Sequence, residues 1–428
     1  NPFGILKDAG QDAWHAGRVV DVIANGPFGV LAAMEHGGVW SLTHSGSAIP
    51  LSDSWDKPDM NSLAAGPDGA SHFFAAGVGL YETDVTHGSP LFHWREITHP
   101  LSRVIKMLVL PASRRIVLAG EGGVVWATIP PPGSPASSYV WRAAQGLPAG
   151  TRYYGAAEGP GETVLVARNP GDTATARLFR GTWSGGDLSF SAATINGVDQ
   201  TAMYRTSLAS CAGNRNFVYA VSSDAEGYML TAFRSTDGGQ TWSPCGKVFE
   251  GAPAGYEFRF VPGNQGNSRN QCVAVSPTDP NRVAFGWRRG PFVSVNGGNT
   301  WRADSMVWNP NNPSNPYFRT PHQHVDLAAV YFDPYDGSQN TLLVGSDGGL
   351  IRTPDLGLTF GSDYNHNLAN LDFVNPSGAR YWYGTLGVSL QGDDLVIGSG
   401  SQDSGNLYCY FDAGSSTPSP WLYLGGGD

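Results

Sequence analysis

Acidic side chains stand next to glycine where several apolar runs of the 428-residue chain end. Glu35 precedes a His-Gly-Gly stretch, Glu121 precedes two glycines, and Asp347 and Asp403 lie in similar short stretches. Two carboxylates that face each other across a cleft can hydrolyse a glycosidic bond, one as acid and the other as base or nucleophile. Acidic–glycine pairs also make tight turns at strand ends. The pattern therefore fits a hydrolytic site or a set of structural turns.

Basic and aromatic residues accompany these carboxylates. Trp14 and Trp287 can stack on sugar rings or pack in a core, and Arg18, Arg288 and Arg289 can hold an anionic sugar or form salt bridges. Carboxylates, arginines and aromatic rings are the groups that build sugar-binding clefts. The predicted substrate-binding residues are His15, Arg18, His36, Glu121, Trp287, Arg288, His322, His324, Asp347 and Gln402.

The stretch His322-Gln-His324-Val-Asp326 places two imidazoles and a carboxylate at alternate positions. Alternate residues of a strand face the same way, so these three side chains can bind a transition metal. A hydrogen-bonded polar cluster at a channel mouth is the favoured interpretation. We therefore predict no metal and no cofactor.

One eight-residue stretch recurs along the chain. Ser235–Trp242 (Ser-Thr-Asp-Gly-Gly-Gln-Thr-Trp) returns as Ser294–Trp301 and, more loosely, as Thr353–Phe360, with 59 residues between successive copies. A fixed period indicates a repeat architecture. An Asp or Asn followed by glycines between two β-runs indicates a hairpin turn, because the side chain accepts backbone N–H bonds and glycine takes positive φ.

Short apolar runs precede each copy, such as Gln271–Val275, Arg282–Gly286 and Pro291–Ser294. With the strand after the turn they make four strands, one blade of a propeller. Applied to the whole chain, this template predicts one propeller over residues 1–428 that continues beyond them. Its repeats begin near residues 17, 60, 104, 152, 203, 270, 323 and 383.

Blade topology places the candidate residues on one face. Loops between second and third strands, and loops between blades, open at the end of the channel opposite the repeat turns, where propeller ligands usually bind. The first kind of loop carries Glu35, Glu121, Trp287, Asp347 and Asp403. The second kind carries His15, Arg18, residues 322–326 and Asp428.

Composition narrows the class of protein. The net charge is −10 and no basic run occurs, so we expect no nucleic-acid partner. No apolar stretch approaches the ~18 residues needed to span a membrane. Low lysine content and many tryptophans favour an extracellular or cell-surface protein. Cys211, Cys245 and Cys272 lie around one repeat and predict either a disulfide or buried thiols; the oligomeric state is not indicated.

The recurring Ser235–Trp242 stretch resembles the Asp-box of secreted BNR-repeat β-propellers of the sialidase, xyloglucanase and sortilin type. Residues 17–19, 345–349, 402–405 and 425–428 add to this resemblance. It implies an all-β fold, a β-propeller of seven or eight four-stranded blades with Asp-box hairpins. It also implies a glycoside-hydrolase-like protein that acts on or binds a polysaccharide. The alternative is a non-catalytic lectin, receptor-type or structural surface propeller.

The resemblance also implies a first catalytic residue. Xyloglucanase-type members carry a catalytic Asp in a first-blade loop, and the matching position here is Glu35, a departure in residue type. We predict Glu35 as one carboxylate, with Asp326, Asp403 or Asp428 as its partner. The sialidase interpretation is weaker, because the sequence contains no Arg-Ile-Pro motif.

Overall fold

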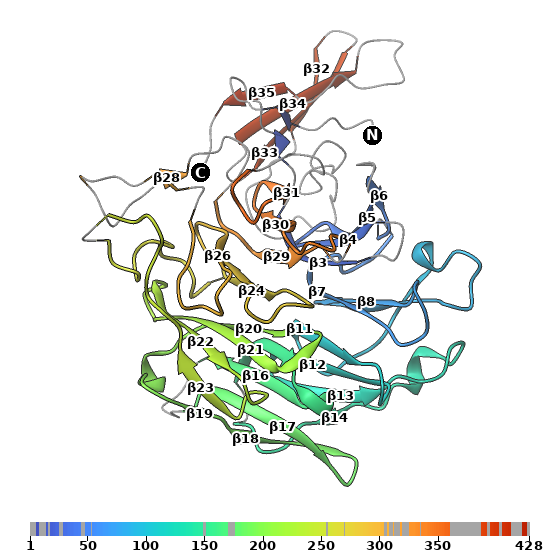
Figure 1. Ribbon diagram of the computed structural model, residues 1–428. Helices are drawn as coiled ribbons and strands as arrows, with labels where there is room; N and C mark the ends of the chain where they lie inside the picture. The colour runs from blue at the N-terminus through green and yellow to red at the C-terminus, as the bar shows by residue number, and fades with distance from the viewer. Residues whose placement is uncertain are drawn as a thin grey trace.

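The protein is an all-β propeller built from antiparallel sheets (Figure 1). The computed structural model describes residues 6–7, 14–15, 18–24, 29–43, 48–52, 54–148, 151–169, 176–253, 256–268, 270–303, 306–307, 311, 317–318, 325–333, 335–359, 387–391, 394–401, 405–411 and 422–425. Helical structure in these residues consists of short 3-10 turns such as η2 (Pro90–Phe92), and none has the length or apolar character of a membrane span.

The first two sheets are meanders of four strands each, in which neighbours along the chain pair antiparallel. The first contains β3 (Val19–Ala24), β4 (Val30–Met34), β5 (Gly38–Leu42) and β6 (Ala48–Pro50). The second contains β7 (Met60–Ala65), β8 (Phe73–Gly77), β9 (Leu80–Thr83) and β10 (Trp94–Glu96).

The third and fourth meanders are joined by pairing of Glu121 with Arg152. The third contains β11 (Arg103–Leu110), β12 (Arg115–Glu121), β13 (Gly123–Thr128) and β14 (Arg142–Ala143). The fourth contains β15 (Arg152–Glu158), β16 (Val164–Asn169), β17 (Leu178–Ser184) and β18 (Asp187–Ala192).

Three further sheets carry the recurring stretches. The fifth contains β20 (Thr206–Cys211), β21 (Asn214–Ser223), β22 (Met229–Ser235) and β23 (Thr241–Pro244), with β19 (Thr194–Ile195) parallel to β23. The sixth contains β24 (Cys272–Val275), β25 (Val283–Gly286) and β26 (Phe292–Ser294). The seventh contains β29 (Ala329–Phe332), β30 (Leu342–Ser346) and β31 (Gly349–Thr353).

The first strands of these seven sheets line a central channel of about 650 Å³. Each of β3, β7, β11, β15, β20, β24 and β29 contacts the next, and β29 contacts β3, so the described sheets close into a ring. The last predicted repeat forms a separate sheet that lies apart from this ring in Figure 1. Its strands are β32 (Gly387–Gln391), β33 (Asp394–Ser401), β34 (Gly405–Phe411) and β35 (Leu422–Gly425).

Apolar side chains fill the space between neighbouring sheets. The first and seventh sheets share one such cluster, in which Val19 and Trp40 pack with Ala329 and Leu343. Trp242 and Trp301, the last residues of the first two recurring stretches, are 1% and 0% exposed. This packing holds the loops at both ends of the channel on a rigid support.

The three recurring stretches form turns with the same hydrogen bonds. In the first, between β22 and β23, the Ser235 hydroxyl accepts the Gly239 N–H at 2.9 Å, and the Asp237 carboxylate accepts the Thr241 N–H at 2.9 Å and its hydroxyl at 2.6 Å. The second turn repeats the two backbone bonds at 2.9 and 3.0 Å and the third at 2.7 and 2.8 Å, through Ser294 with Asn296 and Thr353 with Asp355. The turns are therefore local structural units of the repeat.

Candidate functional site

The polar cluster at one end of the channel is centred on Arg18. Arg18 directly precedes β3, Glu35 lies in the turn between β4 and β5, and Asp347 lies in the turn between β30 and β31. The Arg18 Nε atom is 3.1 Å from Glu35 Oε2, and one terminal nitrogen donates to Asp347 Oδ1. The guanidinium thus joins carboxylates from the first and the seventh sheet.

The other side of the same guanidinium meets the loops before β24 and β29. Its Nη2 donates to Asn270 Oδ1 at 2.8 Å, and the Asn270 amide donates to Asp326 Oδ1 and to Gln265 Oε1, both at 2.8 Å. Asp326 has a φ of 66°, and its backbone N–H donates to the Arg288 carbonyl at 2.8 Å. We call Arg18, Glu35, Asn270, Asp326 and Asp347 the Arg18 cluster.

The electrostatics of the Arg18 cluster favour ionised carboxylates. The side chains of Arg18, Glu35 and Asp347 are 6, 14 and 13% exposed, so little water screens their attraction. A guanidinium in contact with a carboxylate stabilises its charged form. In the ionised form, Glu35 and Asp347 can serve as base, nucleophile or hydrogen-bond acceptor.

Three other predicted residues are described outside the cluster, each with its own partner. His36 Nδ1 lies 2.6 Å from Asp59 Oδ1. Glu121 Oε1 lies 3.5 Å from the Arg152 Nε atom. Arg288 donates to the Asn264 side chain at 3.0 Å.

Trp287 does not have the predicted sugar-stacking position. Its side chain is fully buried, and its indole N–H donates to the Gly227 carbonyl at 3.0 Å. Gly266 lies against the ring so closely that a Cβ there would be 1.8 Å from it. Because protein covers the ring, Trp287 is a core residue, which corrects the predicted role.

Several predicted residues lie outside the described part of the chain: Asp403, Asp428, His322, His324 and Gln402. His15 is described as part of β2 (Trp14–His15), without its side chain. In the described ranges, no group of three His, Cys, Asp or Glu side chains is placed to hold a metal ion. Cys211, Cys245 and Cys272 are free thiols, which corrects the disulfide interpretation for these three.

Two residues at the channel were not predicted, Arg205 and Tyr154. Arg205 directly precedes β20, as Arg18 precedes β3, and its guanidinium lies 4.7 Å from the centre of the Tyr154 ring. The pKa of Arg205 is lowered to about 10, chiefly by burial and in smaller part by the charge of Arg18, while Tyr154 and Glu35 oppose the shift. Arg18 and Arg205 both directly precede the innermost strand of a sheet, and this shared position could have pointed to Arg205 from the sequence.

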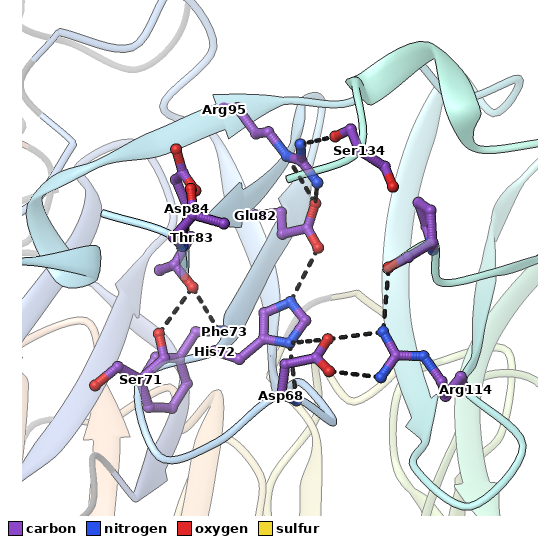
Figure 2. Close-up of polar contacts among 12 residues, drawn as sticks. Asp68, Ser71, His72, Phe73, Glu82, Thr83, Asp84, Arg95, Arg114 and Ser134 are labelled. Carbon is purple, nitrogen blue, oxygen red and sulfur yellow. Dashed lines mark hydrogen bonds and ion pairs between the residues drawn. The ribbon is translucent and has the colours of Figure 1, made fainter. Parts of the chain in front are cut away.

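A second network lies between the second and third sheets and joins the loops that follow β7 and β11 to the strands β9 and β10 (Figure 2). The Asp68 backbone N–H donates to His72 Nδ1 at 3.1 Å, the Asp68 carboxylate lies 3.3 Å from the same nitrogen, and His72 Nε2 lies 2.9 Å from Glu82 Oε1. Glu82 also accepts from Arg95 at 2.6 Å, and Arg114 donates to Asp68 at 2.5 Å.

Each carboxylate of this network has a basic partner. Burial opposes ionisation of Glu82, but hydrogen bonds from His72 and Arg95 outweigh it, so the pKa of Glu82 is lowered. The hydrogen bond from Arg114 likewise lowers the pKa of Asp68. Two carboxylates therefore face two arginines, and the Asp68–Arg114 pair fastens the second sheet to the third.

Comparisons with known proteins support the fold. No protein-family model and no curated protein matches the sequence. The crystal structure of a GH74 enzyme from Niastella koreensis is similar at a TM-score of 0.62 and 15% identity, covering 100% of this chain and 69% of that chain. The extracellular domain of BT4673 from B. thetaiotaomicron is similar at a TM-score of 0.52 and 12% identity, covering 99% of this chain and 47% of that chain. Identities this low show a shared propeller-type fold alone.

Proposed function

We propose that the protein is an extracellular, Asp-box-type propeller that acts on a polysaccharide at the Arg18 cluster. The observation that carries this proposal is the convergence of Glu35, Asp347 and Asp326 at one end of the channel, from loops far apart in the sequence. Ligands of propellers usually bind at such an end. The fold likeness to a GH74 enzyme and to an extracellular domain supports the substrate class and the location.

The cluster is suited to glycoside hydrolysis through two carboxyl groups. Glu35, held ionised by Arg18, would act as nucleophile or as base for water. The second group would protonate the leaving glycosidic oxygen, and Asp326, Asp403 and Asp428 are the candidates. Asp326 belongs to the cluster through Asn270.

Polysaccharide binding without hydrolysis is the second candidate function. One observation favours it: Glu35 and Asp347 are largely buried and both engaged by a single guanidinium. Such a pair can fix the shape of a binding face without reacting. Both functions use the same end of the channel and differ in whether a bond is cleaved.

Reducing-end release from a broad polysaccharide panel at several pH values tests the proposal, together with binding of the same polymers. Release that falls by about 100-fold or more in Glu35→Gln, consistent with loss of a catalytic carboxylate, supports hydrolysis. Asp187→Asn, an exposed carboxylate on the outer strand β18, is the matched control and keeps full activity. Binding without release supports the second candidate, and neither binding nor release across the panel overturns the proposal.

A further inference from the structure

Arg205 is a cation whose hydrogen-bonding capacity the described protein leaves unused. Its Nε atom is buried and has no hydrogen-bond partner among the described residues, and no salt bridge to its guanidinium is formed within them. The Tyr154 ring packs against the guanidinium with their centres 4.7 Å apart. An aromatic ring stabilises such a cation by cation–π attraction and leaves the in-plane N–H groups available.

The other described cations that line the channel are neutralised. Lys106 Nζ is 2.8 Å from Asp21 Oδ2, and Arg215 Nη2 is 2.8 Å from Glu158 Oε2. An arginine retains its charge at neutral pH even when its pKa is lowered to about 10, as burial lowers that of Arg205. Arg205 is therefore a charged donor that faces a channel of about 650 Å³, a volume within the range of ligand sites.

Two consecutive residues, Asn270 and Gln271, link Arg205 to the Arg18 cluster at the same end of the channel. The Gln271 side-chain amide donates to the Arg205 carbonyl at 3.2 Å, and Gln271 directly follows Asn270, which accepts from Arg18. Ser207, two residues after Arg205, donates to Gln271 Oε1 at 2.8 Å. Arg205 is thus linked through Gln271 to the loop that carries Asn270 of the Arg18 cluster.

We propose that Arg205 binds the acidic group of an anionic polysaccharide, a uronate carboxylate or a sulfate ester, at this end of the channel. The inference rests on the proposed function and specifies its substrate class. Guanidinium groups bind carboxylates and related oxyanions through paired N–H donors, and such charge-assisted bonds are stronger than neutral ones. The protein carries a net charge of −10, so a polyanion gains nothing from its overall field and must be attracted locally.

Two matched pairs of soluble polymers test the inference by isothermal titration of the full chain. The first pair is polygalacturonate and its carboxyl-reduced form, and the second is dextran sulfate and dextran; alginate and xyloglucan complete the panel. We expect at least one anionic polymer to bind more tightly than its neutral counterpart, by about 10- to 100-fold, which is what one hydrogen bond between charged groups contributes. This preference weakens as salt is added.

Substitutions at Arg205 assign the preference to this residue. Arg205→Met keeps the length of the side chain and removes the charge, so the preference for the anionic polymer is lost. Arg205→Lys keeps the charge without the paired donors and retains part of it. Arg142→Met is the matched control, because Arg142 lies on the outer strand β14 and its side chain is 56% exposed.

The outcomes separate this inference from the proposed function. A preference for polygalacturonate identifies the acidic group as a carboxylate, and one for dextran sulfate identifies a sulfate ester; both support the inference. Equal binding within both pairs, or an undiminished preference in folded Arg205→Met, overturns it. If xyloglucan alone is bound or cleaved, the inference about Arg205 is overturned and the proposed function is retained. If no polymer is bound or cleaved, both are overturned. The wild-type comparison alone can overturn the inference, and if Arg205→Met does not fold, a reduced preference in folded Arg205→Lys supports the assignment to this residue whereas an undiminished one overturns it.

Discussion

Replacing Asp237 with alanine removes the acceptor at the centre of the first repeat turn. Its carboxylate accepts four hydrogen bonds, from the Ser235 and Thr241 hydroxyls at 2.8 and 2.6 Å and from the Gln240 and Thr241 N–H groups at 3.0 and 2.9 Å. Each such bond contributes roughly 0.5–1.5 kcal/mol net, and water replaces part of the loss at this partly exposed turn. We expect Asp237→Ala to lower the free energy of unfolding by about 2–4 kcal/mol.

The second repeat turn supplies the control, because Asn296 stands where Asp237 stands in the first. Asn296 Oδ1 accepts the Thr300 N–H at 3.0 Å, and its amide donates to the Thr300 hydroxyl at 2.8 Å. An amide therefore satisfies the same turn without a charge. We expect Asp237→Asn to cost about 1 kcal/mol or less.

Thermal unfolding followed by tryptophan fluorescence measures both effects. With roughly 2.1 cal/mol/K of unfolding entropy per residue, a cooperative chain of 428 residues shifts its Tm by about 1 °C per kcal/mol. Asp237→Ala should lower the Tm by about 2–4 °C, and Asp237→Asn by no more than about 1 °C. Equal losses in the two variants would show that the charge matters rather than the acceptor, and a loss below about 0.5 °C in Asp237→Ala would refute the hydrogen-bond argument.

The pH dependence gives the same experiment a second readout. Burial opposes ionisation of Asp237, but hydrogen bonds from Thr241 and Ser235 outweigh it and lower its pKa below 3.8. The carboxylate therefore contributes stability that is present above pH 3.8 and is lost as the pH falls through the folded-state pKa. The Tm difference between the wild type and Asp237→Asn should become smaller as the pH falls from 3.8 through the folded-state pKa.

Three further predictions concern the channel and the thiols. Arg18→Met leaves two largely buried carboxylates without their cation, so it should lower the free energy of unfolding by about 3–5 kcal/mol. A decrease in Tm below 1 °C would contradict this. Adding Glu35→Gln to the same chain should recover part of the loss. Burial raises the pKa of Glu158 above 4.5. The Tm of the wild type minus that of Glu158→Gln should therefore be highest below pH 4.5 and should fall as the pH rises through the folded-state pKa. An opposite slope would refute the assignment. Burial raises the pKa of Cys245 to about 12. In a variant that retains only this cysteine, thiol labelling at pH 8 should be about 10³-fold slower in the folded chain than in the unfolded chain. Equal rates would show that the thiol is not buried.

The sequence predicted the fold because the recurring turns are local. The side chains of Ser235 and Asp237 accept hydrogen bonds from Gly239 and Thr241 of the same stretch, so their spacing indicates a hairpin, and a period of 59 residues indicates repeated units. The weaker repeats were located by apolar runs that match β7 and β8 or β15 and β16. The ring itself depends on contacts between distant sheets, which no local pattern contains.

The sequence predicted which loops carry the candidate site residues, but not which side chains pair with one another. Blade topology placed Glu35 and Asp347 at one end of the channel, where both are found. It could not indicate that Arg18 would join them, because Asp347 lies 329 residues from Arg18 in the sequence and belongs to another sheet. Trp287 shows a second limit of the sequence. It follows β25 in a loop, where an exposed ring is expected, but Gly266 covers the ring.

The way the ring closes determines when the Arg18 cluster can form during synthesis. The strands of the first sheet come from consecutive residues, so the joint between β29 and β3 consists of side chains, such as Val19 against Ala329. Arg18 and Asp347 are separated by 329 residues. At roughly 5–20 residues per second, a ribosome needs about 15–65 seconds to supply the second after the first. During that time the apolar edge of the first sheet has no neighbour on this side, and the last sheet of the ring to be made both covers this edge and completes the site.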